Sequence, residues 1–565
     1  MTRIGIFLLV WFFISFGPRA QAEDQGMTTK LSNAEIMRLG EQMYRYGLLP
    51  SGEPMEAFIR GDIPVDSTAF SCSSCHLRAG LGSYEGGVVT PPTTGRRLYQ
   101  PYRRPPSFDD VIDQAGRYVY AKTIPHRGAY SKESLAIALW NGIDPGGQEF
   151  NPVMPRYLLS ERDMDILIRY LEELSANDSP GVTGSSFSFA TIITDDVSAE
   201  DRQALLVPLE RFVAARNQQV RMYDDFIKFG YTPTNDMKYA FRPASLTVWE
   251  LKGPPETWPD QLQAYYDKGP VFAILGGISN SDWRPIHEFC EAQRLPCLYP
   301  ITNYPVVSET DWYTVYFNKG FYQEGEGAAL YLKNSEDFSE DDKILQLVQD
   351  SLAGKALSAG FDNTWSNLQR PAAKTLLLSK EQLLDQKFLA ALLKKNKADV
   401  LLLWGDGDLV PALPAIVSKL AAGAQIFVSS TFLGKETSLI AESIRSRVFI
   451  TFPFRLTPFV GSKESFDAKV PTLTTAKDFG DRRITSRTET MLQQSALQGL
   501  KLLYDNLFRD YLLDVMSMQM DQIVFDYERL SFGPGQRYTS KGCYILQLGA
   551  GADPQLIPRS EWVMH

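Results

Sequence analysis

Histidine is scarce in this sequence, and the common hydrolase motifs are missing. Only four of the 565 residues are histidines, namely His76, His126, His287 and His565. The sequence also has no G-x-S-x-G elbow, no H-E-x-x-H pair and no phosphate-binding P-loop. A hydrolytic metal centre or a His-based catalytic triad is therefore not expected, and we predict no catalytic residue.

Positive charge and long apolar segments are also in short supply. The chain has 57 Lys and Arg against 67 Asp and Glu, a formal net charge of -10. A surface for nucleic acid needs a dominant cationic patch, so this balance argues against nucleic-acid binding. No segment after residue 22 approaches the roughly 20 apolar residues of a membrane helix, so we expect no span in the mature chain.

The first 22 residues have the form of a secretory signal. Arg3 gives a basic start, an apolar stretch runs from Ile4 to Phe16, and Ala20-Gln21-Ala22 precedes the acidic Glu23. The apolar stretch is too short to serve as a retained anchor, and the small residues suit a cleavage site. We therefore expect residues 1–22 to be removed and the mature protein to be periplasmic.

Cysteine is rare too, but two of the five cysteines form the most specific motif in the chain, Cys72-Ser73-Ser74-Cys75-His76. Two thiols at this spacing can add to the vinyl groups of one haem, and the following imidazole can then bind the iron. A redox dithiol does not need the histidine, and no second cysteine pair stands near enough to complete a zinc site. The motif predicts one covalently attached haem c, held by Cys72 and Cys75, with His76 as an iron ligand.

A methionine between two prolines is the candidate for the second axial ligand. Met154 lies in Asn151-Pro152-Val153-Met154-Pro155, where proline stiffens the backbone and the thioether is a soft donor to ferrous iron. His126 is the competing residue, which would give a bis-histidine haem. The other methionines of this region fit helix cores or loops better: Met43, Met55 and Met164.

Residues 23–178 resemble a class I c-type cytochrome. The resemblance is carried by a helical pattern with Gly40 and Tyr44, Cys72–His76, Trp140–Gly147, Met154–Tyr157, and a closing helical pattern that ends at Tyr170-Leu171. It implies an all-α domain with thioether bonds at Cys72 and Cys75, His76 as the proximal ligand and Met154 as the distal ligand. The sequence departs from the family in the long insert between His76 and Met154.

The C-terminal two-thirds of the chain has the pattern of an α/β protein. Residues 179–186 are polar and lack apolar anchors, which predicts a linker. Beyond them, strand–helix alternation with glycine at strand ends predicts parallel sheets covered on both faces. We expect strands at residues 187–194, 245–251, 271–276, 296–300, 399–403, 425–429 and 448–452.

Residues 187–565 resemble the type I periplasmic solute-binding proteins of the branched-chain amino acid and amide class. The similar segments are Phe272–Ser281, Leu295–Asn303, Tyr313–Gly325 and Ala398–Gly407. The resemblance implies two Rossmann-like lobes, joined by a hinge, that close on a small ligand. The family generally holds a ligand ammonium with an acidic residue after a later strand, but the matching place here, Val428–Thr431, has no carboxylate. An amide, an organic acid or no ligand then fits as well as an α-amino acid.

Ser, Thr and Asn side chains are the candidate ligand contacts. Strand ends that meet helix N-termini offer free backbone N–H groups and a favourable dipole for a carboxylate. The same residue types are the usual helix caps, so each of these residues has a capping role as its alternative. The candidates are Ser279, Asn280, Ser281, Thr302 and Asn303.

The three remaining cysteines are assigned structural roles. Cys290 and Cys297 lie seven residues apart and could close a small disulfide in an oxidising periplasm. Two buried thiols are the alternative for this pair. Cys543 has no partner in the sequence and is expected to be a buried thiol.

These patterns together predict a periplasmic monohaem cytochrome c that transfers electrons, fused to a module that senses or presents a small ligand. Its partner would be a periplasmic dehydrogenase, oxidase or cytochrome, and no bond in a substrate would be made or broken. The alternative is a substrate-binding protein of an ABC transporter, for a small amide, amino acid or organic acid, with the haem as an accessory.

Overall fold

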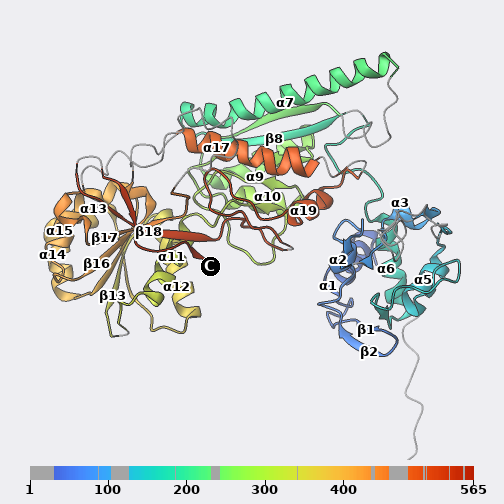
Figure 1. The fold of residues 1–565 in the computed structure, drawn as a ribbon, viewed down its shortest axis with the longest axis horizontal. Coiled ribbons are helices and arrows are strands. Elements are labelled where there is room, and N and C mark those ends of the chain that lie inside the picture. The colour runs from blue at the N-terminus through green and yellow to red at the C-terminus, as the bar shows by residue number, and fades with distance from the viewer. Residues whose placement is uncertain are drawn as a thin grey trace, which may run out of the picture. The chain divides into compact units, whose positions relative to one another are not determined.

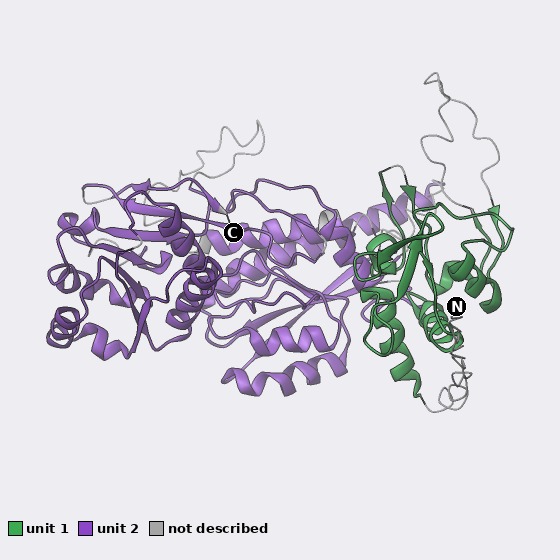
Figure 2. Cartoon of the chain, turned by 90° about the horizontal axis from the view of Figure 1, so that it is seen from below, with its two compact units in different colours: residues 1–176 green, residues 177–565 purple. Residues whose placement is uncertain are grey.

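The computed structural model describes the chain from residue 31 onward, except residues 87, 104–125, 185, 231–241, 340, 434–439, 457–480, 501–502, 504–505, 534, 552–553 and 565. The predicted signal, residues 1–22, lies outside the described residues. The chain forms two compact units, residues 1–176 and 177–565 (Figure 2). Within the described residues, no helix is both long and apolar enough to cross a membrane.

The first unit is built on two packed helices, α1 (Asn33–Tyr46) and α6 (Glu161–Glu173). Ser32 caps α1 by accepting a hydrogen bond from a backbone N–H of its first turn. The helices approach closely, because a Cβ atom placed on Gly40 would lie 2.3 Å from the Cβ atom of Tyr170. The caps and apolar spacing in the sequence predict both helices, and the structure confirms them.

Short elements complete this unit. The described part of this unit also contains the helices α2 (Cys72–His76), α3 (Gly95–Leu98) and α5 (Lys132–Asn141). A three-stranded antiparallel sheet has the order β2-β1-β7, with β1 (Glu56–Ile59), β2 (Ile63–Asp66) and β7 (Arg156–Tyr157). Two further antiparallel pairs join β3 (Tyr84–Glu85) to β4 (Val88–Val89) and β5 (Tyr102–Arg103) to β6 (His126–Arg127).

The prediction of an all-α first unit is therefore wrong. Residues 56–66 form a hairpin although Pro64 suggests a loop, because β2 is the outer strand of its sheet, where proline is tolerated. Arg60 and Gly61, with φ of 51° and 100°, form its turn. Short strands of two to four residues carry too little periodicity to be predicted from the sequence.

Lobe 1 of the second unit is a five-stranded parallel sheet with the order β12-β11-β10-β8-β9. Its strands are β8 (Phe187–Thr194), β9 (Ala244–Leu251), β10 (Ala273–Leu275), β11 (Cys297–Leu298) and β12 (Thr314–Val315). One face packs on α7 (Ala199–Lys228), α17 (Asp481–Met491), a π-helix (Leu492–Gly499) and α19 (Arg509–Ser517). The other face packs on α9 (Trp258–Lys268) and α10 (Arg284–Ala292), so helices cover both faces (Figure 1).

Lobe 2 has the sheet order β14-β13-β15-β16-β17-β18-β19, of which the first five strands are parallel. The strands are β13 (Ile344–Gln349), β14 (Lys374–Leu378), β15 (Val400–Trp404), β16 (Gln425–Val428), β17 (Val448–Phe452), β18 (Gly542–Leu548) and β19 (Leu556–Pro558), with β20 (Val563–Met564) paired to β18. Two cores, one on each face, pack the helices against this sheet. These helices are α11 (Phe321–Asn334), α12 (Leu352–Asn367), α13 (Lys380–Leu384), α14 (Gln386–Lys395), α15 (Leu413–Val417) and α16 (Glu442–Arg445).

The two lobes share one strand order. In each, the first strand lies between the second and the third, so each sheet has a switch point, between β8 and β10 in lobe 1 and between β13 and β15 in lobe 2. The predicted pair of α/β lobes is thereby confirmed. All seven strands expected from the sequence are present, within three residues at each end.

The chain passes between the lobes after β12, after β17 and before β18, and the described residues at these places lie at the carboxyl ends of the parallel strands. The first connection leaves β12 and enters α11, and the third enters β18, whereas the second, between β17 and α17, includes residues 457–480, which lie outside the described residues. The first and third lie side by side, because the N–H of Tyr316 donates to the carbonyl of Arg537 at 2.7 Å and the N–H of Ser540 to the carbonyl of Phe317 at 2.6 Å. The carboxyl ends of both sheets therefore border the region between the lobes.

Candidate functional site

The Cys72–His76 motif forms the short helix α2, which is fixed to α1 and to the following loop. The hydroxyl of Ser73 donates to the carbonyl of Arg45 at 3.0 Å, and the hydroxyl of Ser83 donates to the carbonyl of Cys75 at 3.1 Å. Both cysteines are free thiols in the structure. Cys72 is buried, which raises the pKa of its thiol to about 12, whereas Cys75 is partly exposed.

The imidazole of His76 is buried and held at one nitrogen only. Its Nδ1 atom lies 2.8 Å from the carbonyl oxygen of Pro91, which can only accept, so Nδ1 carries the proton. Burial lowers the pKa of His76 to about 4, and the ring is therefore neutral. Its Nε2 atom then has a free lone pair, and it is buried without a hydrogen-bond partner among the described residues. In metal-ligating histidines the second nitrogen is oriented by a carbonyl in the same way.

The Met154 loop is anchored to the hairpin of the same unit. The N–H of Arg60 donates to the carbonyl of Pro152 at 2.9 Å, and the N–H of Met154 donates to the carbonyl of Asn151 at 2.9 Å. Met154 is partly buried and packs against the core that also contains Cys72. Its role as an iron ligand stays a prediction.

The alternative ligands lie in less suitable places. Met43 and Met164 are buried within α1 and α6, and Met55 is buried just before β1. His126 is exposed on β6. The sequence reasoning missed the carbonyl of Pro91, because a main-chain acceptor leaves no signal in residue type.

The candidate ligand residues after β10 cluster around one carboxylate that the sequence reasoning missed. The Oγ of Ser281 donates to Asp196 Oδ2 at 2.7 Å, and the side-chain amide of Asn280 donates to the carbonyl of Asp196 at 3.0 Å. Thr194, at the end of β8, also donates to this carboxylate. Asp196 therefore ties the loop after β10 to the end of β8 at the switch point of lobe 1.

The candidates after β11 lie on the neighbouring loop. The N–H of Ser279 donates to the carbonyl of Ile301 at 3.3 Å, which brings Ser279 beside Thr302. The hydroxyl of Thr302 accepts from the N–H of Tyr304, and the carbonyl of Asn303 accepts from Phe321, the first residue of α11. The structure thus gathers all five candidates at one edge of lobe 1. The N-caps of the helices that follow, α10 and α11, are Trp283 and Gly320, and the role of the five candidates stays a prediction.

The loop after β11 in lobe 1 approaches the loop after β15 in lobe 2, where Tyr304 lies near Asp406. Tyr304 belongs to lobe 1 but packs against a core of lobe 2. Burial, with the nearby carboxylate of Asp406, raises the pKa of Tyr304 to about 12. Asp406 follows β15, is partly exposed, and has its own pKa raised by burial and then by repulsion from Asp408. Asp406 is a carboxylate at the switch point of lobe 2. Its segment, Ala398–Gly407, contributes to the resemblance, but the sequence did not single out Asp406 as a ligand contact.

A second carboxyl group, from a distant part of the chain, lies beside Val428–Thr431, the segment that has no acidic residue of its own. Glu324 of α11 is fully buried, and its Oε2 accepts from the N–H of Ser430 at 2.7 Å and from Thr451 at 2.6 Å. Its Oε1 accepts from the hydroxyl of Ser430 at 2.7 Å. Burial raises the pKa of Glu324 to about 7, against the lowering effect of these bonds and of Arg483. The segment Val428–Thr431 itself has no acidic residue, but in the folded chain Glu324 lies next to it.

Two arginines of α17 lie against the connections between the lobes. Arg483 is partly buried, with its guanidinium carbon 3.8 Å from the ring centre of Phe454, and desolvation lowers its pKa to about 10. Arg487, one turn later, lies 5.1 Å from the ring centre of Phe317. Asp526 is the buried acid beside them. This cluster fills part of the interlobe region with mutually compensating charges.

Cys290 and Cys297 lie next to each other in the core of lobe 1. The structure holds both as free thiols, so the disulfide predicted from their spacing is not formed in it. A hydrogen bond with Cys297, together with burial, raises the pKa of the Cys290 thiol. Cys543 is a buried thiol as predicted, and accepts from the N–H of Phe452 at 3.1 Å.

Comparison with protein-family models found no match, and comparison with curated proteins found none either. Among solved structures, a type 1 periplasmic binding protein from Bordetella pertussis Tohama I is 14% identical, covering 66% of this chain and 100% of that chain, with a TM-score of 0.45. A leucine binding protein from Thermotoga maritima MSB8 is 10% identical (67% and 99% covered, TM-score 0.45). A branched-chain amino acid ABC transporter protein from Thermus thermophilus with bound valine is 9% identical (67% and 97% covered, TM-score 0.45).

Proposed function

We propose that the chain is a periplasmic solute-binding protein of the type I class, whose two lobes close on a small amino or amide compound. The observation that carries this proposal is the pair of switch points at the ends of β8 and β15, both bordering the interlobe region. In parallel sheets, ligands bind beyond the carboxyl ends of the strands at such points. The cross-lobe approach of Tyr304 and Asp406 supports a site shared by both lobes.

The residues at the two edges suit a compound with a carboxylate or carbonyl at one end and N–H groups at the other. On the loop after β10, the hydroxyl of Ser281 donates to Asp196 and its N–H donates to the hydroxyl of Ser279, so a ligand carboxylate or carbonyl would take over one of these bonds. Asp406 supplies the acceptor on the side of lobe 2, where Lys380 pairs instead with Asp408. A ligand ammonium or amide would therefore be held by Asp406.

The test is titration calorimetry of the full chain with amino acids, amides and organic acids. We expect one compound with an N–H donor to bind and to raise Tm by mass action. Asp406→Asn should weaken it at least about tenfold, or about 1.4 kcal/mol, whereas the matched control Asp408→Asn should bind as the parent does. Equal weakening by both variants, or no binding of any compound, would contradict the proposal.

A second function is favoured by the buried Nε2 atom of His76, and we propose that the first unit carries one haem c for electron transfer. The residues present fit the group. Cys72 and Cys75 have the sequence spacing of a haem attachment motif, His76 has a free lone pair, and Met154 packs against the same core. A bound haem would supply one-electron exchange between ferrous and ferric iron. The chain's own part is to orient His76 through Pro91 and to exclude water from its ring.

This second proposal is tested by expression with the haem-maturation machinery. We expect a covalent haem that survives denaturation, and loss of its low-spin spectrum in His76→Ala. Met154→Leu should abolish the methionine-to-iron absorption band, whereas Met37→Leu on α1 should leave it unchanged. Absence of covalent haem in the parent protein would overturn the proposal without affecting solute binding.

A further inference from the structure

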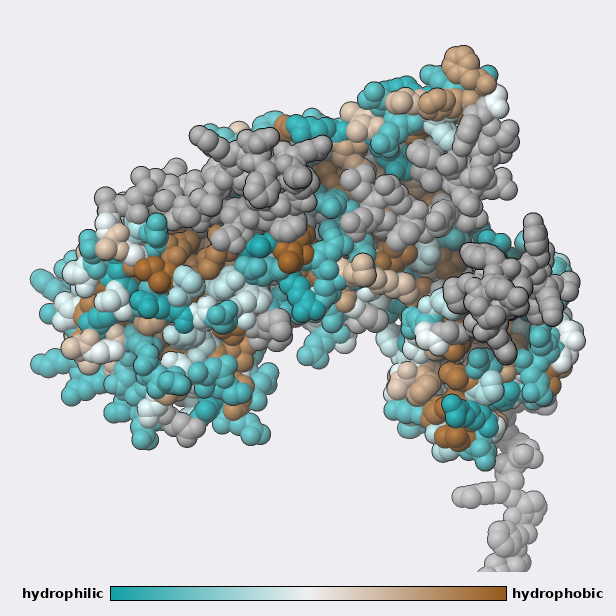
Figure 3. Space-filling view, viewed as in Figure 1, coloured by the Kyte–Doolittle hydropathy of each residue, from teal (hydrophilic) through white to brown (hydrophobic). Residues whose placement is uncertain are grey.

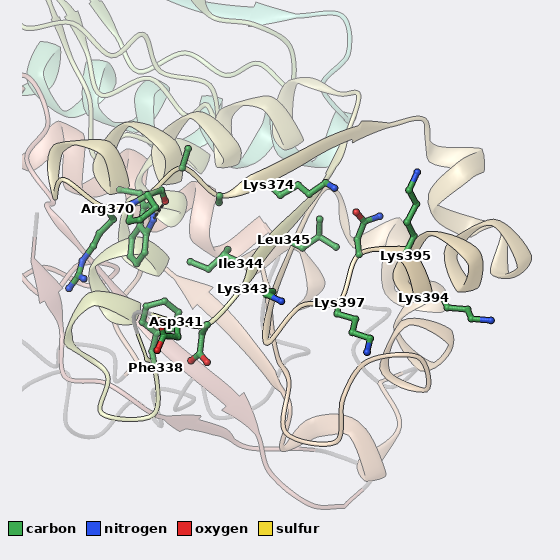
Figure 4. A pocket seen from close by; sticks show the side chains of 16 residues that line it. Phe338, Asp341, Lys343, Ile344, Leu345, Arg370, Lys374, Lys394, Lys395 and Lys397 are labelled. Carbon is green, nitrogen blue, oxygen red and sulfur yellow. Dashed lines mark hydrogen bonds between the residues drawn. The ribbon is translucent and has the colours of Figure 1, made fainter.

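A groove of about 750 Å³ opens at the amino ends of β13, β14 and β15, on the edge of lobe 2 opposite the proposed ligand site (Figure 4). Six of its lining residues are basic and two are acidic. The basic residues are Lys343, Arg370, Lys374, Lys394, Lys395 and Lys397. This local excess of positive charge stands on a chain with a net charge of -10.

The five lysines of this groove are exposed and, among the described residues, make no ion pair. Other lysines of the same lobe are paired, such as Lys355 with Asp350 and Lys380 with Asp408. Compensation of the helix dipole accounts for two of the five, at the last turn of α14. It does not account for Lys343, Lys374 and Lys397, which lie at strand starts and in a loop.

The apolar lining residues form the floor of the groove, and they lie between Arg370 at one end and most of the lysines at the other (Figure 4). The rings of Phe338 and Trp365 lie 5.8 Å apart, edge to face, and Ile344 and Leu345 also line the groove. The lysine side chains extend in different directions rather than converging on one point (Figure 4). The visible face of this lobe is otherwise largely hydrophilic (Figure 3). Spread charges around an apolar floor suit an extended anion better than a compact one.

We propose that this groove docks an acidic segment of a partner protein, with one apolar side chain of that segment on the floor. A basic patch on an acidic protein is attractive to an anionic partner while the rest of the surface repels it, which fixes the orientation of the encounter. The groove lies away from the carboxyl ends of the strands, so docking and solute binding can occur together.

The test is fluorescence anisotropy of the full chain with a labelled peptide of glutamates and one central phenylalanine. We expect binding at low ionic strength that weakens as salt is added. Lys374→Glu with Lys397→Glu should weaken it at least about tenfold. Lys252→Glu with Lys268→Glu, the same charge change at exposed lysines of lobe 1, should bind as the parent does.

Three outcomes would overturn the proposal. Equal binding by the groove variant and the parent would exclude the lysines, provided circular dichroism and Tm show both folded. If the lobe 1 control lost as much peptide binding as the groove variant, the weakening would come from the change in net charge and not from the groove. Displacement of the peptide by citrate at matched concentration would make the occupant a small polyanion instead of a protein. A peptide with serine in place of phenylalanine should bind more weakly, and equal binding would remove the apolar floor from the site.

Discussion

At the scale of single residues, His76 and Glu324 are both buried but differ in how their polar atoms are satisfied. In the part of the chain that the structure describes, the Nε2 atom of His76 has no hydrogen-bond partner, whereas the carboxyl group of Glu324 accepts three hydrogen bonds. A buried polar atom without a partner costs about 1–3 kcal/mol, and the proposed haem iron would remove that cost at His76. The hydrogen bonds of Glu324 are already made within the protein, so its role is to join α11 to β17 and to the turn that follows β16.

Glu324→Gln should flatten the pH dependence of stability of the second unit. The folded carboxyl keeps its proton up to a pH of about 7, whereas the ordinary value is 4.5, so folding takes up a proton between these values. Its contribution is complete below pH 4.5 and is lost as the pH rises through about 7. Across this pH range the free energy of unfolding falls by about 3 kcal/mol on account of this carboxyl group.

The measurement is denaturant unfolding of the parent and the variant across that pH range. Glutamine can keep the bonds to Ser430 and Thr451 without ionising. Glu336→Gln, an exposed carboxyl in the same lobe, is the control and should leave the pH profile unchanged. A parent profile that is flat, or one unchanged in Glu324→Gln, would count against the buried carboxyl.

Cys290 and Cys297 should oxidise to a disulfide when the chain is exported. Their thiols already share a hydrogen bond, and the periplasm is oxidising. Alkylation of the denatured, unreduced protein followed by mass spectrometry counts the thiols that remain. Labelling of both cysteines in exported protein would show that they persist as buried thiols.

At the scale of elements, the fit between α1 and α6 depends on one residue without a side chain. Gly40 lies where any Cβ would meet Tyr170 and the carbonyl of Ile166. The helices themselves follow from caps and periodicity, so the sequence predicts them. Their crossing point, in contrast, depends on which surfaces meet, which no local pattern specifies.

Gly40→Ala should destabilise the first unit by about 1–3 kcal/mol, because the new methyl overpacks the helix crossing. This loss would exceed the gain of about 1 kcal/mol in helix propensity. Gly128→Ala makes the same change where nothing lies within 4 Å, and it should be neutral or slightly stabilising. Thermal unfolding followed by circular dichroism distinguishes the two, and equal Tm values would show that the helices can separate at little cost.

The elements of the second unit were more accessible to sequence reasoning than those of the first. A buried parallel strand such as β15 is a continuous apolar run between Asp399 and Gly405, which gives a strong signal. The β1–β2 hairpin was missed because Pro64 argues against a strand unless the strand is known to be an outer one. Edge position is a property of the sheet and is not visible in the segment itself.

At the scale of the whole molecule, the two units have separate cores. One core is built only from residues of the first unit, and the four others only from residues of the second. Proteins with independent cores unfold domain by domain. The proposed haem and the proposed solute therefore stabilise different parts of the chain.

Calorimetry of the full chain should show separate unfolding transitions for the two units. Gly40→Ala should lower only the transition of the first unit, and Glu324→Gln should alter only that of the second. A bound solute should raise only the transition temperature of the second unit, since it binds only to the folded form of that unit. A single transition that moves as a whole in every variant would mean that the units unfold cooperatively.

The sequence by itself determined the motif at Cys72–His76, the capped helices and the alternation of strands and helices, because these depend on residues close together in the chain. Only the tertiary structure decided the free lone pair of His76, the meeting of Tyr304 with Asp406, and the placement of Glu324 against Ser430. These contacts join residues from different elements. Burial and hydrogen bonding, which set pKa and ligand geometry, are created only when those elements pack.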